Sequence, residues 1–165
     1  MALRHGAEPY DRKALTMTET QVLRGSCHCG QLGLEFSTAM EITGIGPRAC
    51  DCSFCQMHGA AYVSDPVGRL SIFENEPGAL RIYRQGSKRA QFLMCANCGV
   101  LVAVVMEEAG RLYGAANAAC MDGRQAFAAP VPVSPQLLGP DEKVSRWQQA
   151  WVADVLVVKA DASVN

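Results

Sequence analysis

The amino-acid sequence predicts a single-domain, mainly β protein built from antiparallel sheets. Segments rich in β-branched, aromatic and leucine residues follow one another about 8–12 residues apart, which is the spacing of strands in all-β domains. Turn-forming residues, mainly Gly, Pro, Asn and Asp, separate these segments. With 165 residues, of which 49% are hydrophobic, the chain is long enough to bury one core of ordinary size.

The first expected strand covers residues 31–36, where Leu32, Leu34 and Phe36 alternate with other residues, as in a strand with one buried face. Segment 100–106 is a continuous apolar run of strand length. It is far shorter than the ~18–20 residues that a membrane-spanning helix needs. Further strands are expected at 60–64, 69–73, 79–84, 90–94, 111–114 and 152–159.

The two ends of the chain are expected to differ from this pattern. Residues 1–20 are polar and predict a disordered extension before a domain at 21–160, with translation starting at either Met1 or Met17. Near the other end, a short helix is expected at 141–150, with Trp147 and Trp151 four residues apart on one face. An irregular loop is predicted before it, where prolines fall at positions 130, 132, 135 and 140.

Charge and cysteine content exclude several classes of protein. The formal net charge is −1, so the chain lacks the basic surface that nucleic-acid binding requires. Residues 1–20 also lack the apolar stretch of a secretory signal, which favours a cytoplasmic location. In that reducing compartment, clustered cysteines indicate metal binding or catalysis more often than disulfides.

Two pairs of cysteines predict a closed zinc site. They are Cys27 and Cys29, followed by a glycine, and Cys95 and Cys98, also followed by a glycine. A structural zinc takes four protein ligands, and tight turns of this kind direct two thiolates at one point. His28 lies between two ligands, so its side chain is expected to point away from the metal. The alternatives are a redox pair or core cysteines, but a redox CxxC normally begins a helix in a βαβ unit.

Three further cysteines predict an open zinc site. Cys50, Cys52 and Cys55 lie within six residues, close enough for one loop to surround a single ion. Catalytic zinc has three protein ligands and keeps a position for water or substrate, and a substrate thiol that occupies it becomes a thiolate. The alternative is a closed structural site in which Cys120 or His58 supplies the fourth ligand.

The three cysteine motifs resemble those of the glutathione-dependent formaldehyde-activating enzyme family, which includes the centromere protein V group. The resemblance covers about residues 25–122, and the three spacings and their order all match. The motifs are Gly25-Ser26-Cys27-His28-Cys29-Gly30, Cys50-x-Cys52-Ser53-x-Cys55 and Cys95-x-x-Cys98-Gly99.

This resemblance implies a fold of zinc-clamped antiparallel sheets, sometimes called a β-tent, and two zinc ions per chain. It implies that a structural zinc is held by the residues at 27, 29, 95 and 98 and a catalytic zinc by those at 50, 52 and 55. The founding activity of the family joins glutathione and formaldehyde into S-hydroxymethylglutathione, which is formally a carbon–sulfur lyase reaction in reverse.

Residues around the open site differ from those of many relatives. Asp51 adds a negative charge next to the zinc thiolates, and Gln56 stands where many relatives have Arg or Lys. Both differences are expected to weaken the attraction of an anionic thiol such as glutathione. Arg48, Lys88 or Arg89 would compensate if one of them faces the site; the alternative is that all three are solvated surface charges.

Three other side chains are candidates for the same site. His58 follows the cysteine loop and is either a proton shuttle, a role that histidine commonly has, or an ordinary loop residue. Asn117 either binds a substrate oxygen or caps a turn. Phe54 either forms a wall of the substrate pocket or anchors the loop in the core.

The functional hypothesis is a zinc-dependent carbon–sulfur lyase that acts on adducts of a small-molecule thiol and an aldehyde. Zinc held by Cys50, Cys52 and Cys55 would bind the thiol, and His58 or a water would protonate the oxygen of the adduct. The alternative is a non-catalytic zinc-stabilised scaffold with both zinc sites closed. Such a scaffold would bind protein or nucleic acid, and the net charge of −1 argues against nucleic acid. No membrane partner is expected.

Overall fold

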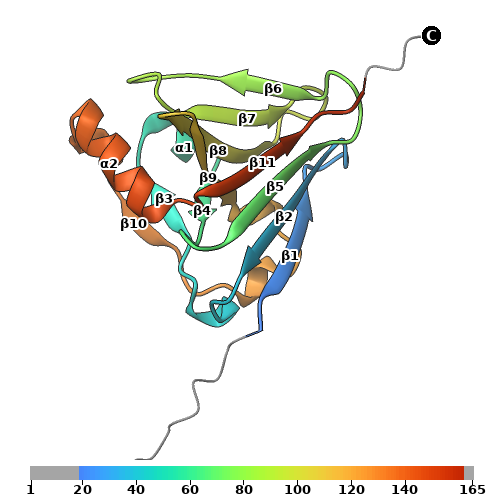
Figure 1. Cartoon of the computed structure of the whole chain (residues 1–165), viewed down its shortest axis with the longest axis horizontal. Coiled ribbons are helices and arrows are strands. Elements are labelled where there is room, and N and C mark those ends of the chain that lie inside the picture. The colour runs from blue at the N-terminus through green and yellow to red at the C-terminus, as the bar shows by residue number, and fades with distance from the viewer. Residues whose placement is uncertain (1–18, 162–165) are drawn as a thin grey trace, which may run out of the picture.

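The predicted mainly β, single-domain fold is confirmed by a computed structural model, which describes residues 19–161. Two sheets form the body of the protein, and helices lie at its margins (Figure 1). The expectation of a disordered extension at 1–20 falls outside the described residues, apart from positions 19 and 20. None of the helices in the described part of the chain is long and apolar enough to cross a membrane.

The first sheet is four-stranded and the second is seven-stranded. In spatial order, the first consists of β1 (Gln21–Ser26), β2 (Leu32–Thr38), β5 (Arg69–Glu74) and β11 (Asp154–Val158). The second consists of β10 (Val131–Val133), β3 (Arg48–Cys50), β4 (Ala61–Val63), β9 (Arg111–Asn117), β8 (Leu101–Glu108), β7 (Gln91–Cys95) and β6 (Leu80–Tyr83).

Two α-helices accompany the sheets. Helix α1 (Ser53–Met57) is a short turn between β3 and β4, and α2 (Pro140–Ala150) precedes β11. Proline is favoured at the first position of a helix, and the carboxylate of Glu142 accepts a hydrogen bond from the backbone N–H of Gly139 at the start of α2. Short 3₁₀ turns occur at η1 (Ile42–Gly44), η2 (Ala118–Cys120), η3 (Arg124–Ala126) and η4 (Pro135–Leu137).

Each predicted strand is present, but the sequence missed β1, β3, β10 and helix α1. Strands β3 and β10 have three residues each, too few to show a hydrophobic period. Strand β10 lies inside the predicted irregular loop, and Pro132 is tolerated there because β10 is at the edge of its sheet. Most strand pairs are antiparallel, as expected, and the β10–β3 and β11–β5 pairs are parallel.

The main core lies between the two sheets. Leu34, Phe36 and Ile72 from the first sheet belong to the same buried cluster as Val102 and Val105 from β8. Other residues of β8, including Val104 and Met106, belong to a second buried cluster. Strand β8 is therefore buried on both faces, which explains its continuous apolar sequence.

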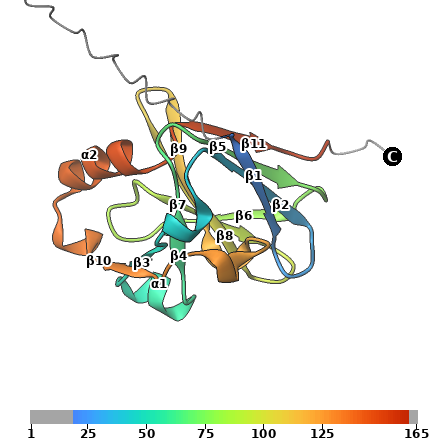
Figure 2. The same ribbon diagram turned by 90° about the horizontal axis from the view of Figure 1, so that it is seen from below.

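The second buried hydrophobic cluster includes side chains of helix α2 and of the loop with Cys50, Cys52 and Cys55. Trp147 and Trp151 stack with ring centroids 4.8 Å apart, and they pack with Cys55, Tyr62 and residues of β8. In two views at right angles, α2 lies on the opposite side of the molecule from β1 and β2 (Figures 1 and 2). The seven-stranded sheet is thus covered by the first sheet on one face and by α2 on the other.

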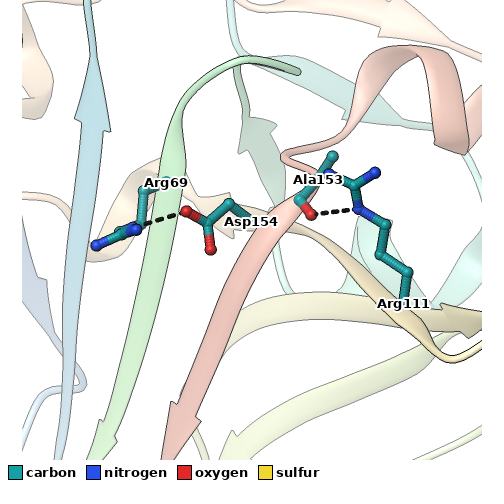
Figure 3. Close-up of polar contacts among 4 residues, drawn as sticks. All are labelled: Arg69, Arg111, Ala153 and Asp154. Atoms are coloured by element: carbon teal, nitrogen blue, oxygen red, sulfur yellow. Dashed lines mark hydrogen bonds and ion pairs between the residues drawn. The ribbon is translucent and has the colours of Figure 1, made fainter.

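Strand β11 returns from α2 to the first sheet and lies beside β5. Arg69 on β5 forms an ion pair with Asp154, with 2.8 Å between Nε and Oδ2 (Figure 3). Arg111 on β9 donates a hydrogen bond of 2.8 Å to the carbonyl oxygen of Ala153 (Figure 3). The chain is therefore attached to both sheets where β11 begins, at Ala153 and Asp154.

Candidate metal centres

The first cysteine cluster brings together four sulfurs from two distant turns. Cys27 and Cys29 lie in the turn between β1 and β2, and Cys95 and Cys98 lie at the end of β7 and in the turn that follows. The four sulfurs lie within 4.8 Å of one another, and the sulfur of Cys29 is 3.6 Å from those of Cys27 and Cys95. A tetrahedral zinc with Zn–S bonds of 2.3 Å separates its sulfurs by about 3.8 Å, so the cluster fits this ion.

Local backbone structure holds these sulfurs in position. Gly30 and Gly99 follow the two pairs with φ of +79° and +75°, a conformation that favours glycine. The backbone N–H of Leu32 donates a hydrogen bond of 3.3 Å to the sulfur of Cys27. The turn that the sequence predicted after each pair is therefore the feature that directs the thiols inward.

The thiols of this cluster differ in acidity. Hydrogen bonds, first from the Asn97 side chain and then from the backbone of Gln31, lower the pKa of Cys29 to about 6. Desolvation raises the pKa of Cys95 to about 11. Four adjacent thiols do not all ionise without a cation between them, because each thiolate opposes the next. The chemistry of the donor set thus matches a divalent, sulfur-binding metal such as zinc.

This cluster connects the four-stranded sheet to the seven-stranded sheet. Strands β1 and β2 belong to the four-stranded sheet, whereas β7 and β8 belong to the seven-stranded one. All eight cysteines are free thiols, so no disulfide makes this connection. His28 is exposed, in agreement with the expectation that its side chain points away from the cluster.

The second cluster contains Cys50, Cys52 and Cys55. Cys50 is the last residue of β3, Cys52 caps the N-terminus of α1, and Cys55 is buried within α1. Their sulfurs lie within 4.8 Å of one another, and the backbone N–H of Cys55 lies 3.5 Å from the sulfur of Cys52. The strand-to-helix turn thus surrounds one point with three thiols.

Two neighbouring side chains contact these sulfurs. The hydroxyl oxygen of Tyr62 on β4 lies 3.3 Å from the sulfur of Cys55, and the amide of Gln85 lies 3.8 Å from that of Cys52. A hydrogen bond from Cys55 lowers the pKa of Cys50 to about 6, and the same bond, together with burial, raises the pKa of Cys55. One thiolate therefore forms readily here, and a metal ion is needed to ionise all three.

Neither proposed fourth ligand reaches this cluster. The thiol of Cys120 donates to the carbonyl oxygen of Leu101 at 3.4 Å and packs in the core between the sheets. The ring of His58 lies against Phe54, with centroids 4.6 Å apart. Among residues 19–161, the group of possible metal ligands at this site consists of the three cysteines alone. The structure thus does not support a site closed by Cys120 or His58.

The three sulfurs lie in the wall of a cavity of about 300 Å³. Its other walls come from β3, β4, the turn after β6, β8, the segment after β10 and helix α2. Tyr62, Phe92, Val104 and both tryptophans contribute to the lining. His58, Phe54 and Asn117 are absent from the lining. The open side of the second cluster therefore faces a space that can hold a small molecule.

The cavity also contains positively charged side chains. Arg48, Lys143 and Arg146 line it. The guanidinium of Arg48 donates a hydrogen bond of 2.6 Å to the hydroxyl of Ser64, which in turn donates to the carbonyl oxygen of Ala150. Burial, followed by repulsion from Arg146, lowers the pKa of Arg48. Arg48, Lys88 and Arg89 were the cations expected to offset the negative charge near the open site. Of these, Arg48 is the one that lines the cavity.

The remaining candidate charges lie outside the cavity lining. The Asp51 carboxylate accepts a hydrogen bond of 2.5 Å from the hydroxyl of Ser134. Arg89 pairs with Glu108 at 3.6 Å, and Lys88 is exposed in the turn before β7. The charge of Asp51 acts on the second cysteine cluster as expected, since it opposes the lowering of the pKa of Cys50 that the hydrogen bond from Cys55 causes. The charged residues that line the cavity itself are cations.

Asn117 and Phe54 have structural roles in this arrangement. The amide of Asn117 donates to the carbonyl oxygen of Leu101 at 2.8 Å, and its oxygen accepts from the backbone N–H of Ala119 at the start of η2. Phe54 packs against Tyr83 and Phe92, with centroids 4.9 and 4.6 Å apart. The turn-capping role of Asn117 and the anchoring role of Phe54 are the ones that the structure supports.

Sequence reasoning did not identify Tyr62 or the charged and aromatic face of α2. A signal for that face was present in the spacing of Lys143, Arg146, Trp147, Ala150 and Trp151, which repeats every three or four residues. The charges on this face suggest solvent exposure when the sequence is considered alone. Only the position of the helix over the cysteine loop reveals that they line a cavity.

Comparison with known proteins gives three results. The sequence pattern of the family described as glutathione-dependent formaldehyde-activating enzyme matches residues 22–133. A crystal structure of a Rhodobacter sphaeroides protein is similar in fold, with a TM-score of 0.51 and 26% sequence identity over 67% of this chain and 99% of that chain. No functionally curated protein matches the chain. The family match ends before α2, so it does not describe that wall of the cavity.

Proposed function

Because the chain belongs to the glutathione-dependent formaldehyde-activating enzyme family, we propose that it is a zinc-dependent carbon–sulfur lyase acting on thiol–aldehyde adducts. One observation carries the proposal: the sulfurs of Cys50, Cys52 and Cys55 converge in the wall of a cavity, with no fourth ligand among the described residues. This is the arrangement of a catalytic metal site, whereas the four sulfurs of the first cluster form a structural one.

The two clusters would each hold one zinc ion. When bound at the second cluster, zinc would supply Lewis-acid activation of a substrate thiol, which loses its proton on coordination. In the first cluster, protein sulfurs fill all four coordination positions of the metal, so its only role would be to stabilise the fold. The scaffold alternative needed a fourth ligand at the second cluster, and both candidates for it lie elsewhere.

The reaction that we propose requires one bond to form and one proton to move. In the direction of synthesis, the substrate sulfur bonds to the aldehyde carbon, the second bond of the C=O group opens, and the oxygen takes up a proton. The hydroxyl of Tyr62 lines the cavity beside Cys55 and is suited to donate a hydrogen bond to that oxygen. Burial raises the pKa of Tyr62, so its hydroxyl keeps its proton at neutral pH.

The walls of the cavity have a second role in this proposal. Phe92, Val104 and Trp151 are buried and apolar, so they exclude water from the reacting atoms when a substrate is bound. The proton-shuttle role predicted for His58 stays a prediction. Its ring packs on Phe54 outside the lining, which gives this role no structural support.

The substrates would be small molecules from a reducing compartment, where the seven thiols of the two clusters remain available to zinc. The experiment that tests the proposal is a panel of thiols and aldehydes incubated with zinc-loaded protein, in which adduct formation is followed by NMR. Cys52→Ser protein is the matched control, because it lacks one thiol of the second cluster and keeps the first. Catalysis by the parent protein and not by the variant supports the proposal; equal rates for both would overturn it.

A further inference from the structure

We propose that Arg48 and Arg146 form a carboxylate-binding site within the cavity, so that the enzyme selects thiols or adducts with a carboxylate group and an apolar body. The inference rests on the proposed function for the sulfur end of the substrate and adds the groups that hold its other end. It is carried by the charges, hydrogen bonds and aromatic side chains of the cavity walls.

The cavity holds cations that are not paired with a carboxylate. Arg48, Lys143 and Arg146 line it, and none of the ion pairs among the described residues includes any of the three. Unpaired charges in a partly desolvated space are costly to the folded protein. An anionic ligand would remove this cost, which makes the cavity complementary to a negatively charged group.

Arg48 is held in place by a neutral partner. Its guanidinium donates to Ser64, and the hydroxyl of Ser64 donates to the carbonyl oxygen of Ala150, the last residue of α2. These bonds fix the orientation of the guanidinium and leave its charge uncompensated. A fixed planar guanidinium binds both oxygens of a carboxylate with little loss of side-chain entropy.

Arg146 comes from the helix to which Arg48 is tied. It lines the same cavity as Arg48. An anion in this cavity is attracted by both guanidinium groups. The pair therefore has the character of a ligand site and not of a structural contact.

The aromatic wall of the cavity favours a particular shape and polarity for the part of the ligand that carries no charge. The rings of Trp147 and Trp151 stack at 4.8 Å with an interplanar angle of 16°, and both line the cavity with Phe92. Such a surface favours a planar or apolar group. A singly charged carboxylate fits better than a doubly charged phosphate, because three thiolates bound to one zinc leave a net negative charge at the other end of the substrate.

Tryptophan fluorescence provides a test that is independent of thiol chemistry, since both tryptophans of the chain line the cavity. The probes are 3-phenylpropionate and its neutral analogue 3-phenylpropionamide, each titrated into zinc-loaded protein. We expect the carboxylate to bind at least about tenfold more tightly than the amide, as is typical for hydrogen bonds to a charged group.

Variants assign this preference to the arginines. Arg146→Gln, on the half-exposed surface of α2, is expected to reduce the preference to less than about threefold, and Arg48→Gln to do the same. Arg81→Gln is the matched control, because Arg81 is exposed on β6 and lies outside the cavity lining. The control should bind both probes as the parent protein does.

Equal affinity for the two probes overturns the inference. It is also overturned if Arg146→Gln keeps the preference. The same holds if this variant loses the preference only together with its zinc, since the arginine would then balance the charge of the metal centre. The proposed function is tested separately with 3-mercaptopropionamide, an uncharged thiol, on cobalt-substituted protein. A change in the cobalt spectrum supports thiol binding whatever the probes show, and its absence contradicts thiol binding without affecting the carboxylate preference.

Discussion

Cys29 and Cys95 are 66 positions apart in the sequence, yet their sulfurs lie 3.6 Å apart. The first residue lies in the turn of the β1–β2 hairpin and the second ends β7, so the contact connects one sheet to the other. A metal ion at this point would cross-link the two halves of the main core. Its removal is therefore expected to affect the whole fold.

The first prediction is that Cys95→Ser unfolds the protein. A structural zinc contributes about 10 kcal/mol or more to folding, which is comparable to the ~5–15 kcal/mol total stability of a typical domain. Metal analysis and thermal unfolding of the purified variant would test this. A Cys95→Ser protein with the zinc content and melting temperature of the parent would refute the assignment of this residue as a ligand.

Cys52→Ser is predicted to behave differently. It should lose about one zinc per chain and remain folded, because the three cysteines of its cluster lie in a single short turn and connect no distant strands. Circular dichroism and metal analysis together distinguish this outcome from unfolding. Loss of both zinc ions in Cys52→Ser would contradict the independence of the two sites.

The third prediction concerns metal removal. Freshly purified protein should contain no disulfides, and denaturation with a chelator should release about two zinc ions per chain and make all eight cysteines titratable. Mass spectrometry and a colorimetric thiol assay measure both quantities. A Cys95–Cys98 disulfide in protein kept under reducing conditions would indicate a redox pair instead.

The fourth prediction is that Cys120→Ala leaves both metal sites intact. The thiol of Cys120 donates to the carbonyl oxygen of Leu101, which also accepts from Asn117, so that carbonyl keeps a partner in the variant. The loss in stability should be about 1–2 kcal/mol from the lost contacts. Unchanged zinc content and an unchanged cobalt spectrum are expected; a new thiol-dependent spectrum in the variant would show that Cys120 had closed the second site.

The fifth prediction compares Tyr62, the proposed hydrogen-bond donor to the substrate oxygen, with His58, the proton shuttle expected from the sequence. Tyr62→Phe should lower the rate of adduct formation by about 100-fold with zinc content unchanged, because the loss of one hydrogen-bond donor to a developing oxyanion commonly costs that much. His58→Gln should change the rate less than about threefold, since His58 lies outside the cavity lining. The reverse order of effects would restore His58 as the proton shuttle and exclude Tyr62. The pH–rate profiles of both variants separate proton donation from a change in metal affinity.

The ligand groups could be predicted from the sequence because short cysteine spacings limit the possible geometry. Cys50, Cys52 and Cys55 share one turn, so local structure alone brings them together. The pairing of the Cys27 and Cys95 motifs needed only the four-ligand rule for structural zinc. The strands with clear alternation or continuous apolar sequence, such as β2 and β8, were predicted for similar reasons.

The walls of the cavity could not be predicted, because they depend on contacts between distant segments. The carboxylate of Asp51, which we expected beside the metal, accepts a hydrogen bond from Ser134, a residue 83 positions later in the sequence. Arg48 is bonded through Ser64 to the end of α2. The chemical character of the cavity therefore depends on tertiary contacts, whereas each cysteine motif is organised by local structure.

The parallel pairing of β11 with β5 has a consequence for biosynthesis. Asp154 is 85 positions after its partner Arg69, so β5 has no neighbour on that side until the chain has been synthesised past residue 154. Sheets that depend on such late, distant pairing fold slowly, and an open strand edge promotes aggregation in the meantime. A nascent chain that ends before residue 154 would expose this edge, which makes the last strand the step on which the yield of folded protein depends.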